Sequence, residues 1–156
     1  MGKIVISDNV SLDGVIQDPA GDEGFTRGGW VGRLMDELNL HGRVEFQFGL
    51  RSAELARLYN SAEVAVCSSL FEGFGLPAAE ALASGLPLVS TRGGALEEVV
   101  GSAGVLVPVA DPGALADAVN ALLADPPRRA AMGRAARARA LECFQWERAA
   151  REVEQV

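Results

Sequence analysis

The stretch FEGFGLPAAEALASGLPLV, residues 71–89, decides the fold of this chain. It holds two carboxylates, Glu72 and Glu80, with seven residues between them. The short apolar run Val64–Cys67 precedes it and is typical of a strand. A second strand begins at Leu88, directly after a Gly-Leu-Pro break. The stretch therefore predicts a strand, a glycine-rich loop, a helix and a further strand in succession.

The chemistry of this unit is expected at the loop. In open parallel sheets, ligands bind at the carboxyl ends of the strands. Pro77 suits the first helical turn, because its missing N–H has no intrahelical partner there. The N–H groups near Gly75 and Leu76 can then face an anion. Since Glu72 and Glu80 flank this position, the pattern suits a ligand with phosphate in the middle and hydroxyls at both ends, such as a nucleotide-sugar.

A tight turn followed by an ordinary helix is the alternative interpretation, because glycine-rich loops before helices are common. Glu80 favours the functional one. It is the only charged residue between Gly73 and Ser84, on a helix otherwise rich in alanine and leucine, and it has no structural partner evident in the sequence. A solvated helix face normally carries several polar residues.

The stretch resembles the signature of the retaining nucleotide-sugar glycosyltransferases of family 4, which have the two-domain GT-B fold. This resemblance covers roughly residues 33–156 and implies an α/β fold: a Rossmann-like parallel sheet with flanking helices, half of a GT-B fold, with a C-terminal helical segment. Further segments that resemble the family are residues 44–49, 53–59, 93–100, 104–108, 111–112 and 144–146.

The resemblance implies the roles of individual residues. Glu72 would bind hydroxyls of the donor sugar, Glu80 would bind those of the ribose, and Gly49 would lie near the base. The donor would be linked to UDP or GDP. Retaining transfer in this family needs no obvious protein nucleophile, so no catalytic residue is named. The residues expected to bind the donor are Gly49, Glu72, Phe74, Gly75, Leu76 and Glu80.

The N-terminal segment follows another pattern. Residues 3–7, 11–19 and 28–30 resemble the start of bacterial reductases related to dihydrofolate reductase. The chain is therefore interpreted as a fusion of a reductase-like fragment, residues 1–32, with an incomplete donor-binding domain, residues 33–156.

By the same resemblance, this domain is expected to lack two family strands and the basic loop that follows the first of them. Residues 3–6 are expected to form a strand that replaces a missing one, between the strands at 44–48 and 64–67. Arg51 and Arg92 are the nearest candidates to replace the basic residues.

The remaining pattern alternates strands and helices, as in a parallel sheet covered by helices. Asp111-Pro112 and Asp125-Pro126 are start signals for two C-terminal helices. The arginines of the second helix are expected to form a solvated face. Further strands are expected at 88–90 and 105–107, and helices at 31–38, 53–59, 77–84 and 95–100.

Composition bounds the function. The 156 residues suit one domain, and the net charge of −7 argues against nonspecific binding of nucleic acid or anionic membranes. No apolar run approaches the ~20 residues of a membrane span. With one histidine, His41, neither a histidine-based metal site nor a histidine-dependent triad is expected, and no cofactor is expected. Two distant cysteines, Cys67 and Cys143, suggest a cytoplasmic protein without a disulfide framework.

Three functions therefore compete. The first is a glycosyltransferase donor-binding domain that is inactive alone. The second is a non-catalytic fragment or fusion product in which the fold persists without donor binding. The third is a reductase-like protein using NADPH, which is the weakest because no G-x-G-x-x-G follows the first predicted strand.

Overall fold

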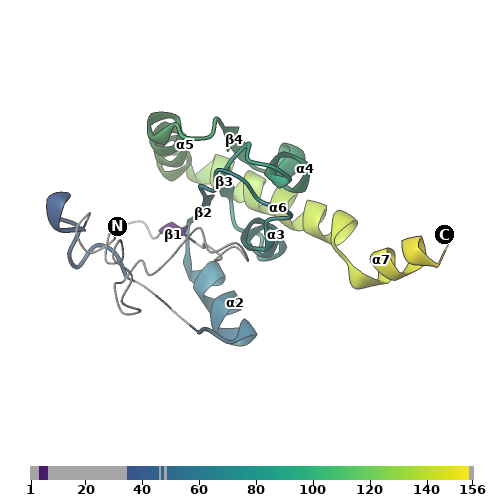
Figure 1. The fold of residues 1–156 in the computed structure, drawn as a ribbon. Helices are drawn as coiled ribbons and strands as arrows, with labels where there is room; N and C mark the ends of the chain where they lie inside the picture. The colour runs from purple at the N-terminus through teal and green to yellow at the C-terminus, as the bar shows by residue number, and fades with distance from the viewer. Residues whose placement is uncertain (1–3, 7–34, 46, 48, 155–156) are drawn as a thin grey trace, which may run out of the picture. The chain divides into compact units, whose positions relative to one another are not determined.

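The computed structural model describes residues 4–6, 35–45, 47 and 49–154 (Figure 1). The chain divides into two compact units, one made of residues 1–8 and 51–156 and the other of residues 9–50. Among the described residues, no helix combines the length and the apolar character needed to cross a bilayer. The reductase-like pattern at residues 7–30 lies outside the described residues.

The first unit contains a parallel sheet of four strands in the order β1-β2-β3-β4. The strands β2 and β4 begin and end where the sequence predicts, and β3 is one residue longer. The α/β prediction is thus confirmed within this unit. The strands are β1 (Ile4–Ile6), β2 (Val64–Cys67), β3 (Leu88–Thr91) and β4 (Val105–Val107).

The strand β1 confirms that residues 4–6 join the sheet beside β2, with Ile4 opposite Val64. The expected strand at residues 44–48 is wrong for its described part, since positions 44, 45 and 47 belong to no strand. Val44 is 40% exposed, so the described start of this run does not pack into a core. Positions 44, 45 and 47 therefore do not pair with β1. Among the described strands, β1 lies at one edge of the sheet.

The helices follow the local start signals. The Asp111 and Asp125 carboxylates accept the N–H groups of Ala114 and Arg128, each at 2.9 Å, as helix caps do. The predicted helix at 31–38 is helical at residues 35–37 in its described part. The described helices are α2 (Ser52–Ser61), α3 (Leu76–Ala83), α4 (Leu96–Val100), the 3-10 turn η1 (Gly101–Ala103), α5 (Pro112–Ala124), α6 (Pro126–Cys143) and α7 (Trp146–Val153).

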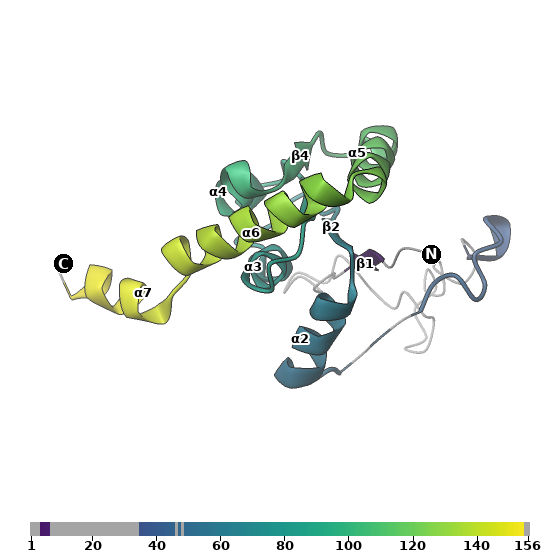
Figure 2. The same ribbon diagram turned by 180° about the vertical axis from the view of Figure 1, so that it is seen from behind.

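Two hydrophobic cores cover the two faces of the sheet. Successive strand residues point to opposite faces, so Ala65 and Cys67 pack with α3, α4 and α6, while Val64 and Val66 pack with α5. Figure 1 shows α5 and α3 on opposite sides of the strands. Figure 2 shows α6 running from the end of α5 past α3. Both faces of β2 and β3 are therefore covered by helices.

The arginines of α6 correct the prediction of a purely solvated face. The guanidinium of Arg129 donates to Leu122 O and Leu123 O near the end of α5. Arg137 donates to Ala83 O at the end of α3. Arg139 donates to carbonyls of residues 98 and 99, at the end of α4. The last carbonyls of a helix have no intrahelical partner, so these cations stabilise three neighbouring helices.

Replacing Arg139 by alanine is expected to lower the free energy of unfolding by roughly 1–3 kcal/mol, because the end of α4 loses its charged donor. Arg134→Ala is the matched control. It removes the same charge from the same helix, at an exposed residue with no described hydrogen bond. Urea denaturation monitored by circular dichroism measures both. Equal effects of the two substitutions would contradict the role assigned to Arg139.

Candidate functional site

Two loops lie side by side at the carboxyl ends of β2 and β3. One is the β2–α3 loop, residues 68–75, and the other is the β3–α4 loop, residues 92–95. The N–H of Ala95 donates to Glu72 O at 2.9 Å, and the Thr91 hydroxyl donates to Ser69 O. A Cβ at Gly93 would lie 2.7 Å from two carbonyl oxygens of the β2–α3 loop. The two loops are therefore in direct backbone contact.

The side chain of Glu72 is half-buried within this contact. Its Oε1 accepts a hydrogen bond from the Ser69 hydroxyl at 2.7 Å. Within the described part of the chain, no hydrogen bond reaches Oε2. Glu72 is thus held by its backbone carbonyl and by one carboxylate oxygen, while the second oxygen remains available.

The carboxylate of Glu80, on α3, is also half-buried and also held through one oxygen. The hydroxyl of Tyr59 lies 3.2 Å from Glu80 Oε2 and 3.4 Å from Pro77 O. Tyr59 belongs to α2 and is only 2% exposed. The expectation that Glu80 has no structural partner is therefore wrong, because its partner comes from a helix that lies 21 positions earlier.

The start of α3 is a glycine with a left-handed backbone. Gly75 precedes the helix with φ of +90°, a region that favours glycine, and a Cβ there would lie 2.6 Å from Leu96 Cδ2. Among the described residues, no hydrogen bond from the N–H of Gly75 or Leu76 is found, as is usual for the first residues of a helix. Both N–H groups are therefore available at the position where the sequence predicts an anion.

The two apolar candidates differ in their surroundings. Phe74 is 45% exposed, and its ring meets that of Phe144 edge to face, with centroids 5.8 Å apart. Leu76 is 57% exposed at the first position of α3. Phe74 is thus anchored to the end of α6, whereas Leu76 points its side chain to solvent.

The remaining candidates make no described hydrogen bond to the side chain of Glu72 or Glu80. Gly49 belongs to the second unit, where its φ is +62° and a Cβ would meet nothing within 4 Å. Arg51 donates to the Glu54 carboxylate at 2.9 and 3.1 Å, which lowers the pKa of Glu54 and raises that of Arg51. Arg92 forms an ion pair with Glu97. Both candidate cations are therefore already paired with a carboxylate of the chain.

Four residues of this region were not identified as candidates from the sequence: Tyr59, Ser69, Thr91 and Gly94. Ser69, three residues before Glu72, has the spacing of a local hydrogen bond, which could have identified it. Gly94 belongs to a Gly-Gly pair, which marks a turn. Tyr59 and Thr91 act across distant segments, for which a single sequence gives no signal.

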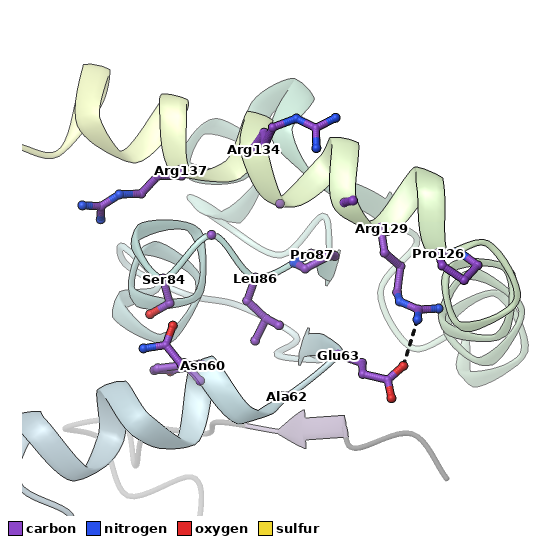
Figure 3. A pocket seen from close by; sticks show the side chains of 14 residues that line it. Asn60, Ala62, Glu63, Ser84, Leu86, Pro87, Pro126, Arg129, Arg134 and Arg137 are labelled. Carbon is purple, nitrogen blue, oxygen red and sulfur yellow. Dashed lines mark ion pairs between the residues drawn. The ribbon is translucent and has the colours of Figure 1, made fainter.

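A pocket of about 500 Å3 lies at the opposite, amino-terminal edge of the strands (Figure 3). Glu63, just before β2, forms an ion pair of 3.1 Å with Arg129 beside it. Figure 3 shows the guanidinium of Arg134 directed away from Leu86. Because its cations do not converge on the cavity, this pocket is not the candidate site. Among the described residues, no group of three or more His, Cys, Asp or Glu side chains could hold a metal ion.

The family described as glycosyl transferases group 1 matches residues 30–139. The chain belongs to this family. The glycosyltransferase assignment of the sequence is therefore confirmed, whereas the reductase resemblance of the N-terminal segment gains no support, since the match begins at residue 30.

Sequence relatives and solved structures both match most of this chain. The MMP alpha-(1->4)-mannosyltransferase of Mycolicibacterium hassiacum is 46% identical over 118 residues, 74% of this chain and 29% of that protein. Sucrose-phosphate synthase of Thermosynechococcus elongatus superposes with a TM-score of 0.78 at 35% identity, over 86% of this chain and 35% of that one. Anabaena Alr3699/HepE, solved with UDP-glucose, gives 0.72 at 25% identity, over 85% and 38% of the two chains.

These structural neighbours are GT-B glycosyltransferases, so the fold-class prediction is confirmed. The chain spans about a third of the length of the relatives that it matches.

Substituting Gly94 by alanine is expected to destabilise the site. A Cβ there would lie 2.4 Å from Glu72 O, and the φ of +60° is strained for alanine, so we expect a loss of roughly 1–3 kcal/mol. Gly73→Ala is the control, because a Cβ at Gly73 meets nothing within 4 Å. Thermal unfolding of the two variants compares them. A Gly94→Ala protein as stable as Gly73→Ala would show that the two loops do not depend on this contact.

Proposed function

We propose that this chain binds the nucleotide-sugar donor of a retaining, family 4 glycosyltransferase of the hexosyltransferase type, with UDP or GDP as the nucleotide. The observation that carries the proposal is the pair of half-buried carboxylates, Glu72 and Glu80, on the two sides of a helix start whose N–H groups are open. Carboxylate oxygens accept hydrogen bonds from hydroxyls, and helix N-termini attract phosphate.

The proposed roles follow the order of groups in such a donor. Glu72 accepts hydroxyls of the sugar, and Glu80 accepts those of the ribose. The N–H groups of Gly75 and Leu76 hold the diphosphate between them. Phe74 and Gly49 complete the proposed binding set, with Gly49 near the base.

Two further observations support the proposal. HepE, at 25% identity, was solved with UDP-glucose. The names of the mannosyltransferase and of the sucrose-phosphate synthase describe enzymes that act on sugars. Arg51 and Arg92 are each paired with a carboxylate, whereas the first N–H groups of α3 have no hydrogen-bond partner among the described residues, so the helix start can attract an anion.

Transfer to an acceptor is proposed to need more of the family fold than this chain supplies, because the chain covers 29% of its mannosyltransferase relative. We further propose the division into a reductase-like segment, residues 1–32, and a donor-binding domain, residues 33–156. A cytoplasmic location belongs to the same proposal.

Calorimetric titration of the full chain with UDP, GDP, UDP-glucose and NADPH tests the proposal. We expect binding of one nucleotide diphosphate and its sugar, and none of NADPH. Glu80→Gln should weaken nucleotide binding by roughly 1.5–3 kcal/mol, about ten- to a hundredfold, because the ribose hydroxyls lose a charged acceptor.

The matched control is Glu142→Gln, which removes an exposed carboxylate from α6, far along the chain from both loops. Its affinity should equal that of the parent protein. Binding of NADPH alone would favour the reductase-like alternative, and absence of all binding would favour a fragment that does not bind a donor.

A further inference from the structure

We propose that two hydroxyls of the chain are positioning groups for the two carboxylates: Tyr59 orients Glu80 toward the ribose, and Ser69 orients Glu72 toward the sugar. This inference rests on the proposed function and adds to it the residues that set the geometry of each subsite. Each hydroxyl engages one carboxylate oxygen and leaves the other for a hydroxyl of the donor.

Tyr59 is placed to hold Glu80 without meeting the ligand itself. Its side chain is 2% exposed, so it has almost no surface for a ligand, and it lies in the core beneath α3. A hydroxyl has one hydrogen to donate, and Glu80 Oε2, at 3.2 Å, is nearer than Pro77 O, at 3.4 Å. Pro77 O also belongs to a helix, where carbonyls accept the N–H four residues later, so it depends less on Tyr59.

Ser69 holds Glu72 in the same way from within the β2–α3 loop. Its hydroxyl donates to Glu72 Oε1 at 2.7 Å, a short bond of the kind formed with a charged acceptor. Its own carbonyl accepts the hydroxyl of Thr91, which is 3% exposed at the end of β3. The bond from Thr91 therefore holds the backbone of Ser69 against β3. The Ser69 hydroxyl in turn holds the carboxylate of Glu72.

The one-oxygen arrangement has a consequence for affinity. A free glutamate side chain loses rotamer freedom when it binds a ligand, which costs binding free energy. A hydroxyl bound to one oxygen removes part of that freedom beforehand. Loss of Tyr59 OH should therefore weaken ligands with ribose hydroxyls, and loss of Ser69 OH should weaken ligands that carry the sugar.

Matched ligands separate these effects from simple destabilisation. Calorimetry compares the parent, Tyr59→Phe and Ser69→Ala proteins with three probes: UDP, 2′,3′-dideoxy-UDP and UDP-glucose, or the guanosine series with GDP-mannose if GDP binds more tightly. We expect Tyr59→Phe to lower the affinity for UDP about three- to tenfold and to leave that for dideoxy-UDP unchanged. We expect Ser69→Ala to leave UDP unchanged and to lower the affinity for the sugar nucleotide about three- to tenfold.

Ser61→Ala is the control for hydroxyl removal, because Ser61 is exposed and its one hydrogen bond among the described residues goes to Leu58 O in its own helix. It should change no affinity. If Tyr59→Phe weakens UDP and dideoxy-UDP equally, or neither, the positioning role of Tyr59 is overturned. If Ser69→Ala weakens UDP as much as UDP-glucose, or weakens neither, that of Ser69 is overturned. A parent protein that binds no nucleotide diphosphate overturns the proposed function itself, and the inference with it.

Discussion

The backbone of α6 touches the turn that follows α3, and the rest of the first unit depends on this contact. A Cβ at Gly133 would lie 2.5 Å from Gly85 O, so only glycine permits the two segments to approach so closely. Ala136 and Ala140 continue the buried side of α6 with small side chains. At this separation the arginines of α6 can reach the final carbonyls of α3, α4 and α5. One helix thus holds three others by their carboxyl ends, where the helix dipole favours positive charge.

This arrangement sets the position of α3 at both of its ends. At the carboxyl end, Arg137 binds the Ala83 carbonyl. At the amino end, the side chain of Leu96 occupies the space that a Cβ of Gly75 would need. Phe144 adds an aromatic contact from the end of α6 to Phe74 in the β2–α3 loop. The position of Glu80 is therefore set by packing around α3. Although the net charge of the chain is −7, the first N–H groups of this helix give a local positive potential that can attract an anion.

Local signals in the sequence predicted much of this architecture. Asp111 and Asp125, each before a proline, mark the starts of α5 and α6, and the apolar runs at residues 64–67 and 105–107 are strands with the expected bounds. Each of these features depends on neighbours within a few positions. The prediction of a strand at residues 44–48 was wrong for its described part, because pairing in a sheet depends on a partner strand elsewhere in the chain. The sequence also did not predict the arginine contacts of α6, since the acceptors of Arg139 lie 40 and 41 positions away in the chain.

The glycine-rich stretch alone does not determine how its two carboxylates are presented. Glu80 is held by a tyrosine from α2, and the serine that holds Glu72 is itself held by a threonine of β3. The distance between the two acidic groups is accordingly a property of the whole sheet and its covering helices. Grafting residues 71–89 onto another protein would transfer the residue types without the geometry. Similar short stretches in unrelated chains therefore indicate this chemistry only where the surrounding strands and helices accompany them.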